Sequence, residues 1–351
     1  MNEVPSHTMK TLQMAARINV DNEKKESFGQ FFGFIARFKK NYDNQTELYS
    51  RYQRFASAIS RVEQLNQEHK GNAQFELNQF ADLTPEEFLE RHAGSRMPEK
   101  ASEARTYINF GTETRARSTT AGGNDFDSTN RTRSKRSYLP YSYDMRDENL
   151  ITGVRDQGQC GCCFIFASLE GIQGAYAKKY RTRVRLSVEQ ILSCYQDAVP
   201  HSQCNGGNTE DVLQFVAKYG VARDSDYPFT SSDGYAGTCQ NENRENYSTG
   251  FSHVRGEEED MKEALYNYGT LVVGMDAEDL QYYSRGIFSP SGRSNQINHS
   301  VNIVGWGEEN GTPYWIVKNS WTNRWGENGY FRITRGYNTA LIESYVQVAL
   351  V

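Results

Sequence analysis

Gln157-Gly-Gln-Cys-Gly-Cys-Cys163 runs directly into residues 164–180, whose sequence is FIFASLEGIQGAYAKKY. This run is mostly apolar and predicts a helix from Cys163 to Lys179. A thiol at a helix start faces unsatisfied backbone N–H groups and the positive end of the helix dipole, which lower its pKa. The side-chain amide of Gln157 is a donor that suits an oxyanion beside an attacking sulfur. The pattern therefore indicates a nucleophile at Cys163, although a buried structural cysteine at a helix end would give the same local sequence.

Two later residues supply the other groups that a cysteine nucleophile needs. His299 stands at the entry to the apolar strand SVNIVGW, and Asn319 follows the strand-like segment PYWIV. An asparagine amide can accept a hydrogen bond from the imidazole and hold the ring toward the sulfur. A lone histidine at a strand end is more often an ordinary polar residue, so the prediction depends on the pair. Trp321 is placed to shield this bond from water, or simply to pack in the core.

The six cysteines all lie in the second half of the chain, at positions 160, 162, 163, 194, 204 and 239. A nucleophile requires at least one free thiolate, so two disulfides and two free thiols are one arrangement that fits. A zinc site is the alternative, because Cys160 and Cys163 have the spacing C-x2-C. No second pair of ligands follows at zinc spacing, so we expect no metal and no cofactor.

The chain of 351 residues is longer than one compact core usually supports, and its composition divides it into four parts. We expect an N-terminal extension at 1–22, a helical unit at 23–90 with a long helix from about Thr46, a linker at 91–136, and a main domain at 137–351. The linker is rich in Gly, Ser and Thr and ends in the basic run 131–136, so cleavage near Ser137 is expected. The main domain begins with helices at 163–179, 187–193 and 209–219. It ends with strands, interrupted by a helix at 257–268.

Charge and hydropathy exclude several classes of function. A net charge of -5 supplies no basic field, so nucleic acid is not an expected partner. No stretch approaches the roughly 20 apolar residues that cross a bilayer. The first twenty residues lack the charged start and apolar block of a secretory signal, although four N-glycosylation triplets, at Asn44, Asn130, Asn246 and Asn310, suit a secreted route. We expect a soluble, lysosomal or secreted protein whose signal is missing from this sequence.

These motifs together resemble the papain family of cysteine proteases. Cys163 and His299 are 136 residues apart (299 − 163), within the spacing of that family. The resemblance implies that Cys163 attacks, His299 transfers the proton, Asn319 orients it and Gln157 stabilises the oxyanion. It also implies the disulfides Cys160–Cys204 and Cys194–Cys239, and substrate-binding roles for the remaining matched positions, which are Gly206, Gly207, Asn298, Trp321 and Tyr345. The last of these is expected at the floor of the second specificity pocket, or else packed in the barrel.

The N-terminal unit resembles the inhibitory propeptide of the same family. Glu47, Arg51, Phe55, Val62 and Asn66 match its long-helix motif, and the residues Asn78, Phe80 and Asp82 match its second motif. Ala58 and Glu76 depart from these motifs where Asn and Gly are usual. The resemblance implies that this unit covers the cleft until acid loosens it. An ordinary amphipathic helix is the alternative.

The nucleophile segment departs from the family signature. Cys162 stands at a small-residue position, Phe164 replaces Trp or Tyr, and Met145 replaces another Trp. One hypothesis is that Cys162 makes the site redox-sensitive by resolving an oxidised Cys163. A second hypothesis is that the chain is a catalytically impaired homologue that binds peptides or a partner protein.

The main expectation is a cysteine endopeptidase made as an inactive zymogen, acting through a Cys-His-Asn triad after propeptide removal. The expected fold is α+β, with a helical left subdomain and a barrel-like right subdomain, preceded by the helical propeptide. Expected partners are polypeptide substrates and the chain's own propeptide, with no nucleic acid and no membrane. The protein is expected to be a monomer.

Overall fold

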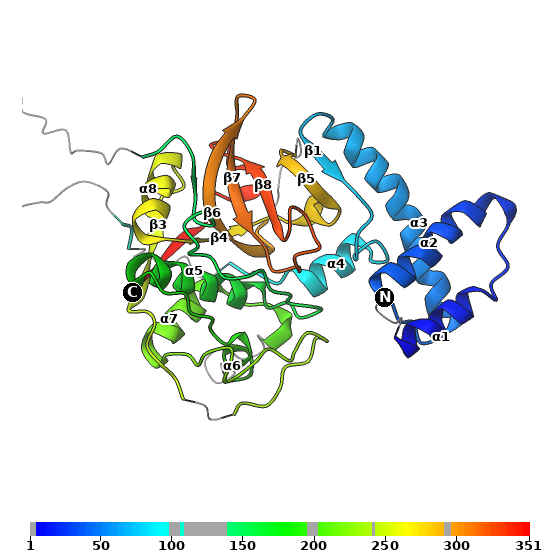
Figure 1. Ribbon diagram of the computed structural model, residues 1–351, viewed down its shortest axis with the longest axis horizontal. Helices are drawn as coiled ribbons and strands as arrows, with labels where there is room; N and C mark the ends of the chain where they lie inside the picture. The colour runs from blue at the N-terminus through cyan, green and yellow to red at the C-terminus, as the bar shows by residue number, and fades with distance from the viewer. Residues whose placement is uncertain (1–4, 98–105, 109–138, 195–202, 241–242, 291–295) are drawn as a thin grey trace, which may run out of the picture.

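The computed structural model describes residues 5–97, 106–108, 139–194, 203–240, 243–290 and 296–351. The chain forms an N-terminal unit (residues 5–97) and a main domain (residues 139–351), and the N-terminal unit projects from one end of the main domain (Figure 1). The expected cleavage region at 131–137 lies outside the described residues. Figure 1 shows helices on one side of the main domain and strands on the other, the α+β arrangement that the sequence predicts.

The N-terminal unit is built from helices α1 (Ser6–Ala15), α2 (Lys25–Phe38), α3 (Gln45–Glu68) and α4 (Pro85–His92), with the strand β1 (Ala73–Phe75) before α4. A short 3-10 helix, η1 (Asn22–Lys24), precedes α2. Asn44 caps α3 by accepting from Glu47 N, and Thr84 and Glu87 form a capping box at α4. These caps explain why α3 begins one residue before the predicted position.

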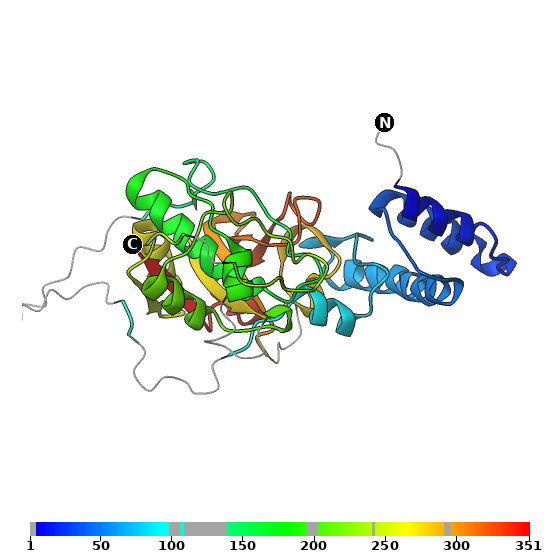
Figure 2. The same ribbon diagram turned by 90° about the horizontal axis from the view of Figure 1, so that it is seen from below.

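The N-terminal extension is not separate from this unit. In α1, Thr8 and Ala15 are fully buried, and Thr11 Oγ1 accepts a hydrogen bond from Tyr42 N at 3.1 Å. Figure 2 shows α1 lying along the α2–α3 pair. The periodic aromatic residues of α2 and α3 form the core beneath it, with Phe31 and Phe55 rings 5.4 Å apart. The sequence division at residue 22 therefore does not correspond to a boundary in the packing.

The helical side of the main domain contains α5 (Cys163–Tyr180), α6 (Val188–Cys194), the 3-10 helix η3 (Gln203–Asn205) and α7 (Thr209–Tyr219). Helix α5 is mostly apolar and lies between the two sides, and nearly all of it is buried. Gly174 allows α5 to touch the sheet, because a Cβ there would lie 1.9 Å from Thr270 Oγ1. The helix predicted at 257–268 is present as α8 (Glu258–Tyr268).

The strand side is one nine-stranded sheet in the order β1-β5-β8-β7-β6-β4-β9-β3, with β2 (Tyr143–Asp144) paired to β6. Two short 3-10 helices, η4 (Glu278–Leu280) and η5 (Thr339–Leu341), interrupt it. The strands are β3 (Gly250–Val254), β4 (Leu271–Met275), β5 (Tyr283–Phe288), β6 (His299–Glu309), β7 (Thr312–Lys318), β8 (Tyr330–Thr334) and β9 (Val346–Leu350).

The N-terminal unit contributes a strand to this sheet. Ala73 and Gln74 of β1 pair antiparallel with Gly286 and Arg285 of β5. The buried apolar residues of the N-terminal unit and of the sheet form one continuous cluster, whereas α5, α6 and α7 share a second cluster. The N-terminal unit is therefore anchored to the strand side, and α4 continues toward the line where the two sides meet (Figure 1).

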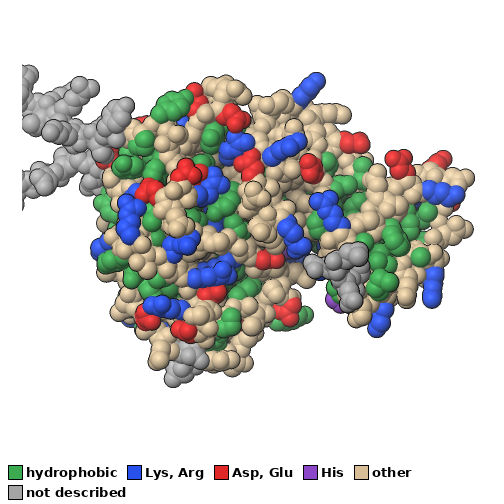
Figure 3. Space-filling view, in the orientation of Figure 1, with side chains coloured by type: hydrophobic (Ala, Val, Ile, Leu, Met, Phe, Trp, Pro, Cys, Tyr) green, Lys and Arg blue, Asp and Glu red, His purple; other side chains and the backbone are tan. Residues whose placement is uncertain are grey.

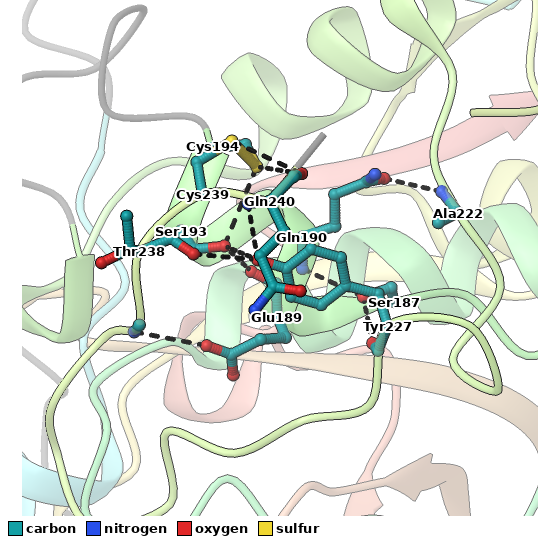
Figure 4. Close-up of a disulfide and its surroundings, with 11 residues drawn as sticks. Ser187, Glu189, Gln190, Ser193, Cys194, Ala222, Tyr227, Thr238, Cys239 and Gln240 are labelled. Carbon is teal, nitrogen blue, oxygen red and sulfur yellow. Dashed lines mark hydrogen bonds between the residues drawn. A yellow bond between two sulfur atoms is a disulfide. The ribbon is translucent and has the colours of Figure 1, made fainter. Parts of the chain in front are cut away.

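Two disulfides fasten the helical side. Cys160 bonds to Cys204, and Cys194 bonds to Cys239. Around the second disulfide, Tyr227 OH lies 2.9 Å from Ser193 Oγ and accepts from Gln240 N (Figure 4). The carboxylate of Glu189 accepts from Ser231 N and Ser231 Oγ. Long loops on this side are thus held by covalent and polar contacts more than by regular structure.

Within the described residues, no helix combines the length and apolarity needed to span a membrane. Figure 3 shows acidic and basic side chains interspersed on one face of the molecule, without a broad patch of either sign.

Candidate active site

Cys163 is the first residue of α5, and Cys162 is its N-cap. The chain reaches this point through a constrained loop, because a Cβ on Gly158, whose φ is +60°, would lie 2.2 Å from Ser232 O. Cys163 is fully buried. Burial raises the pKa of the Cys163 thiol to about 12, although the backbone groups of Ser300, of Ser95 and of the helix start act in the opposite direction. The helix start favours a thiolate, but in this state the lack of water outweighs it.

His299 and Asn319 lie at the facing ends of two strands, with His299 the first residue of β6 and Asn319 directly after β7. His299 Nε2 is 2.9 Å from Asn319 Oδ1. Since Oδ1 can only accept, the neutral imidazole carries its proton on Nε2 and leaves Nδ1 as an acceptor. Ser320 N donates to the same Oδ1 at 2.8 Å and so fixes the amide orientation.

His299 Nδ1 is buried and has no hydrogen-bond partner among the described residues. Burial lowers the pKa of His299 to about 4, and its bond to Asn319 opposes that shift. With the Cys163 pKa raised, both groups are neutral near pH 7, as a thiol and an imidazole. Cys163 and His299 are therefore both uncharged in this state of the chain.

Trp321 covers the His299–Asn319 bond. Its ring stacks on the imidazole with centroids 4.6 Å apart and an interplanar angle of 23°. Trp325 meets Trp321 edge to face at 4.9 Å. Trp321 therefore covers the His299–Asn319 bond and also packs in the core.

Gln157 is held beside the helix start by contacts with the strand side. Its Oε1 accepts from Ser320 Oγ at 2.7 Å, and its Nε2 donates to Cys160 O at 2.9 Å. Gln157 N also donates to Ser320 O at 2.9 Å. The amide cannot rotate without breaking these bonds, so the second N–H of Nε2 has a fixed direction.

The unusual neighbours of Cys163 have structural roles. Cys162 is a free, fully buried thiol in the core of the helical side, and burial raises its pKa well above the usual value. A resolving thiol has to ionise and reach its partner, so this environment weakens the redox hypothesis. Phe164 packs its ring edge on Gly207, where a Cβ would lie 2.5 Å from Phe164 Cε2.

The N-terminal unit crosses the cleft just after α4. Gly207 N donates to Gly94 O and Gly207 O accepts from Arg96 N, both at 2.9 Å, in a parallel bridge centred on Ser95. Across the cleft, Asn298 O accepts from both Gly94 N and Ser95 N at 2.9 Å. These are the backbone groups that an extended peptide would use, and the chain itself occupies them.

Other contacts hold this cover in place. Asn78 Nδ2 donates to Gln281 O at 2.7 Å, and Gln281 Nε2 returns a bond to Phe80 O at 3.0 Å. Arg61 forms an ion pair with Asp279 at 2.9 Å. Asn78 and Phe80 of the second propeptide-like motif thus contact the main domain directly.

Tyr345 lies just before β9 and is buried, with 5% exposure. Its hydroxyl donates to Glu210 Oε1 at 2.6 Å, and its backbone oxygen accepts from Gly274 N at 3.1 Å. Gly274 pairs with Ser300, the neighbour of His299. Tyr345 therefore lies against β4, next to the strand that carries Ser300, and its hydroxyl is tied into a polar cluster.

His92, at the end of α4, was not singled out by the sequence. It is buried, its O accepts from Trp321 Nε1 at 2.8 Å, and its ring lies 4.5 Å from the Phe80 ring. Burial lowers the pKa of His92 to about 3, with the charges of Lys40 and Arg91 acting in the same direction. Its position three residues before the cleft-crossing Ser95 was the available signal.

Comparison with known proteins shows the family to which the chain belongs. The family model described as papain family cysteine protease matches residues 139–350, which is more than half of the chain. The chain belongs to the papain family of cysteine proteases. The cathepsin propeptide inhibitor domain matches residues 31–88, within the N-terminal unit. The resemblance inferred from the motifs is confirmed, and the N-terminal unit is an inhibitory propeptide of this family.

The chain is similar to viral cathepsins, a bromelain and a procathepsin. Viral cathepsin of Heliothis zea nuclear polyhedrosis virus is 33% identical over 323 residues, which cover 88% of this chain and 81% of the relative. Fruit bromelain of Ananas comosus is 32% identical, covering 89% and 82% respectively. Among solved structures, procathepsin L 3 from Tenebrio molitor larval midgut has a TM-score of 0.74 at 26% identity, covering 93% of this chain and 99% of its own. These findings establish a cysteine-type endopeptidase in zymogen form.

Proposed function

We propose that this zymogen becomes a competent endopeptidase that cleaves polypeptides through Cys163, His299 and Asn319 once the propeptide leaves. The observation that carries the proposal is the 2.9 Å bond between His299 Nε2 and Asn319 Oδ1, which leaves Nδ1 as an acceptor at the closed cleft. Removal of the cover returns water to the cleft and reverses the burial that keeps both groups neutral. The proton then moves from Cys163 Sγ to His299 Nδ1, giving a thiolate and an imidazolium.

The proposed chemistry has two halves. The Cys163 thiolate attacks the peptide carbonyl, and the oxyanion is held by Cys163 N–H and Gln157 Nε2. The His299 imidazolium gives its proton to the leaving amine, so a thioester remains on Cys163. His299 then takes a proton from water, the resulting hydroxide attacks the thioester, and the carboxylic acid and free thiol are released.

The same proposal assigns substrate binding to groups that the propeptide now occupies. Gly207 N and O and Asn298 O are the backbone partners of an extended substrate, and Gly206 keeps the edge narrow, because a Cβ there would lie 2.5 Å from Gly94 O. Trp321 forms the wall over His299, and Tyr345 lines the second specificity pocket. A monomer in a lysosomal or secreted location remains part of the proposal.

The impaired-homologue alternative has less support. It was motivated by Cys162, Phe164 and Met145, and each of these side chains is buried in well-packed surroundings. A pure binding protein has no chemical need for an oriented histidine, a fixed asparagine amide and a fixed glutamine amide together.

The deciding experiment acidifies the full chain with reductant and then adds an epoxide that alkylates only an activated thiolate. We expect one equivalent of label on Cys163 and cleavage of a peptide substrate. The Cys163→Ser chain is expected to take no label, whereas Cys162→Ser is expected to be labelled like the natural sequence. Absence of label after propeptide loss, or label on Cys162, would refute the proposal.

A further inference from the structure

A cluster of buried polar side chains lies beside the cleft and takes no part in the proposed chemistry. Tyr345 OH donates to Glu210 Oε1 at 2.6 Å, and His253 Nε2 lies 3.0 Å from the same oxygen. Gln347 Nε2 donates to Tyr345 OH at 3.2 Å, and Thr209 Oγ1 donates to Gln347 Oε1 at 2.6 Å. All five side chains are buried, and we call them the polar wall.

The polar wall adjoins the groups that hold a peptide backbone. Asn208 follows Gly207, caps α7 through Glu210 N at 2.7 Å, and has its Oδ1 3.5 Å from Tyr345 OH. On the other side, Ser300 Oγ donates to Ser95 Oγ of the propeptide at 2.8 Å. A side chain that leaves an extended peptide at Gly207 would therefore meet the wall first.

Two segments that precede the main domain, at Arg96 and at residues 106–108, contact the wall or its neighbours on this side. Asn208 Nδ2 donates to Arg96 O at 3.2 Å. Farther along, Ile108 N donates to His253 O at 3.0 Å, and His253 N donates to Thr106 O at 2.9 Å. The Tyr107 ring lies 5.9 Å from the His253 ring. Cleavage in the linker that follows releases both contacts, so activation exposes the wall to substrate.

The chemistry of the wall disfavours an apolar occupant. An aliphatic side chain would strip water from a carboxylate, a phenol and amide groups without offering hydrogen bonds in return. A cationic side chain donates hydrogen bonds and also offsets the charge of the Glu210 carboxylate, and such charge-assisted bonds are stronger than neutral ones. His253 belongs to the same cluster, because its Nε2 lies 3.0 Å from Glu210 Oε1 and so helps to hold the carboxylate in place.

We propose that Glu210, positioned by Tyr345 and His253, makes the second specificity pocket of the mature enzyme select a basic side chain in its polypeptide substrates. This inference rests on the proposed function, because pocket selectivity can be measured only in an active protease. The residue concerned is the second one before the cleaved bond.

The test compares two fluorogenic peptides that differ only at this residue, one with lysine and one with norleucine. Both side chains contain four carbons in an unbranched row, and lysine adds a terminal ammonium group. The enzyme is the full chain after acid activation, with its concentration set by epoxide titration of Cys163. We expect kcat/KM for the lysine peptide to exceed that for norleucine by about tenfold or more.

Glu210→Gln is expected to reduce the lysine-to-norleucine ratio to near one, since it keeps the shape but loses the charge. Tyr345→Phe, which keeps the ring and removes only the hydroxyl, is expected to lower the ratio partly. Glu257→Gln, an exposed change before α8, is the matched control and should leave the ratio unchanged.

A ratio of one or below in the natural sequence would overturn the proposal, as would an unchanged ratio in titrated Glu210→Gln or, if that variant does not fold, in Tyr345→Phe. Failure of the proposed function would look different, because no enzyme would then take up the epoxide.

Discussion

Protonation of His92 is expected to help release the propeptide in acid. The His92 pKa is lowered from 6.5 to about 3 in the closed chain, because the imidazole is buried between α4 and the main domain. A group with a depressed pKa that is neutral when buried stabilises the closed state fully above pH 6.5. That contribution is lost as the pH falls from 6.5 toward 3. At pH 4 the linkage amounts to about 3 kcal/mol, or on the order of a hundredfold in the closing equilibrium.

Few groups around the His92 ring stabilise its protonated form. Lys40, Arg91 and His299 are the charged or titratable groups that lower its pKa, and only the Gly158 backbone acts in the opposite direction. The adjoining cavity of about 640 Å³ is also lined by the ionisable residues Lys39, Glu47, Arg51, Asp82, Asp156 and Arg324. Lys40 is already paired with Asp82 at 2.7 Å. The proposed catalytic pair would add little to this pH dependence, since a proton transfer from Cys163 to His299 takes up no proton from solution.

The assay is the rate at which an epoxide labels Cys163 in the full chain, divided by the rate in mature enzyme at the same pH. For the natural sequence this ratio should rise steeply between pH 6.5 and pH 4. His92→Phe fits the aromatic surroundings of Phe80 and Phe88 but cannot titrate, so its ratio should rise much less. His7→Phe, on the exposed side of α1, is the matched control. An identical pH profile for His92→Phe and the natural sequence would refute the reasoning.

Three further changes test other parts of the structure. Asn319→Ala is expected to lower kcat by about a hundredfold or more with a smaller effect on KM, because it frees the His299 ring; steady-state kinetics on titrated enzyme measures this. Arg61→Ala removes the ion pair with Asp279, and both side chains of that pair are more than one-third exposed. We therefore expect the closed state to lose no more than about 1 kcal/mol, measured from the pH profile of activation. A larger loss would contradict the view that this ion pair holds the propeptide only weakly. Replacing Cys194 and Cys239 together by Ser should lower the free energy of unfolding by about 2 to 4 kcal/mol in denaturant titrations, whereas an unchanged midpoint would show that the polar contacts suffice.

Much of the fold could be predicted because local pattern and tertiary packing agree. The run after Cys163 is mostly apolar, and the structure uses it as the helix α5 between the two sides of the main domain. The strands β6 and β7 carry the apolar and aromatic sequences that indicated them, and their ends place His299 and Asn319 together. The boundaries of these two strands could be read from the sequence. They determine that His299 and Asn319 lie close together.

The parts that could not be predicted depend on contacts between distant segments. Strand β1 has three residues and exists only because β5 offers it an edge. His92 has an ordinary sequence context, and its lowered pKa arises from burial against the main domain. The polar wall joins Glu210, His253 and Tyr345 from three separate elements, and spacing along the chain does not reveal such a grouping.

The pairing of β1 with β5 also bears on how the protein behaves in bulk solution. The propeptide strand ends the sheet, so its departure uncovers a backbone edge of unpaired donors and acceptors at residues 283–286. Such edges template association between copies of a chain. Only Arg285 places a charge on the stretch that β1 now covers. We therefore expect the zymogen to stay monodisperse at higher protein concentration than the mature enzyme, which gains an open cleft but also an exposed sheet edge.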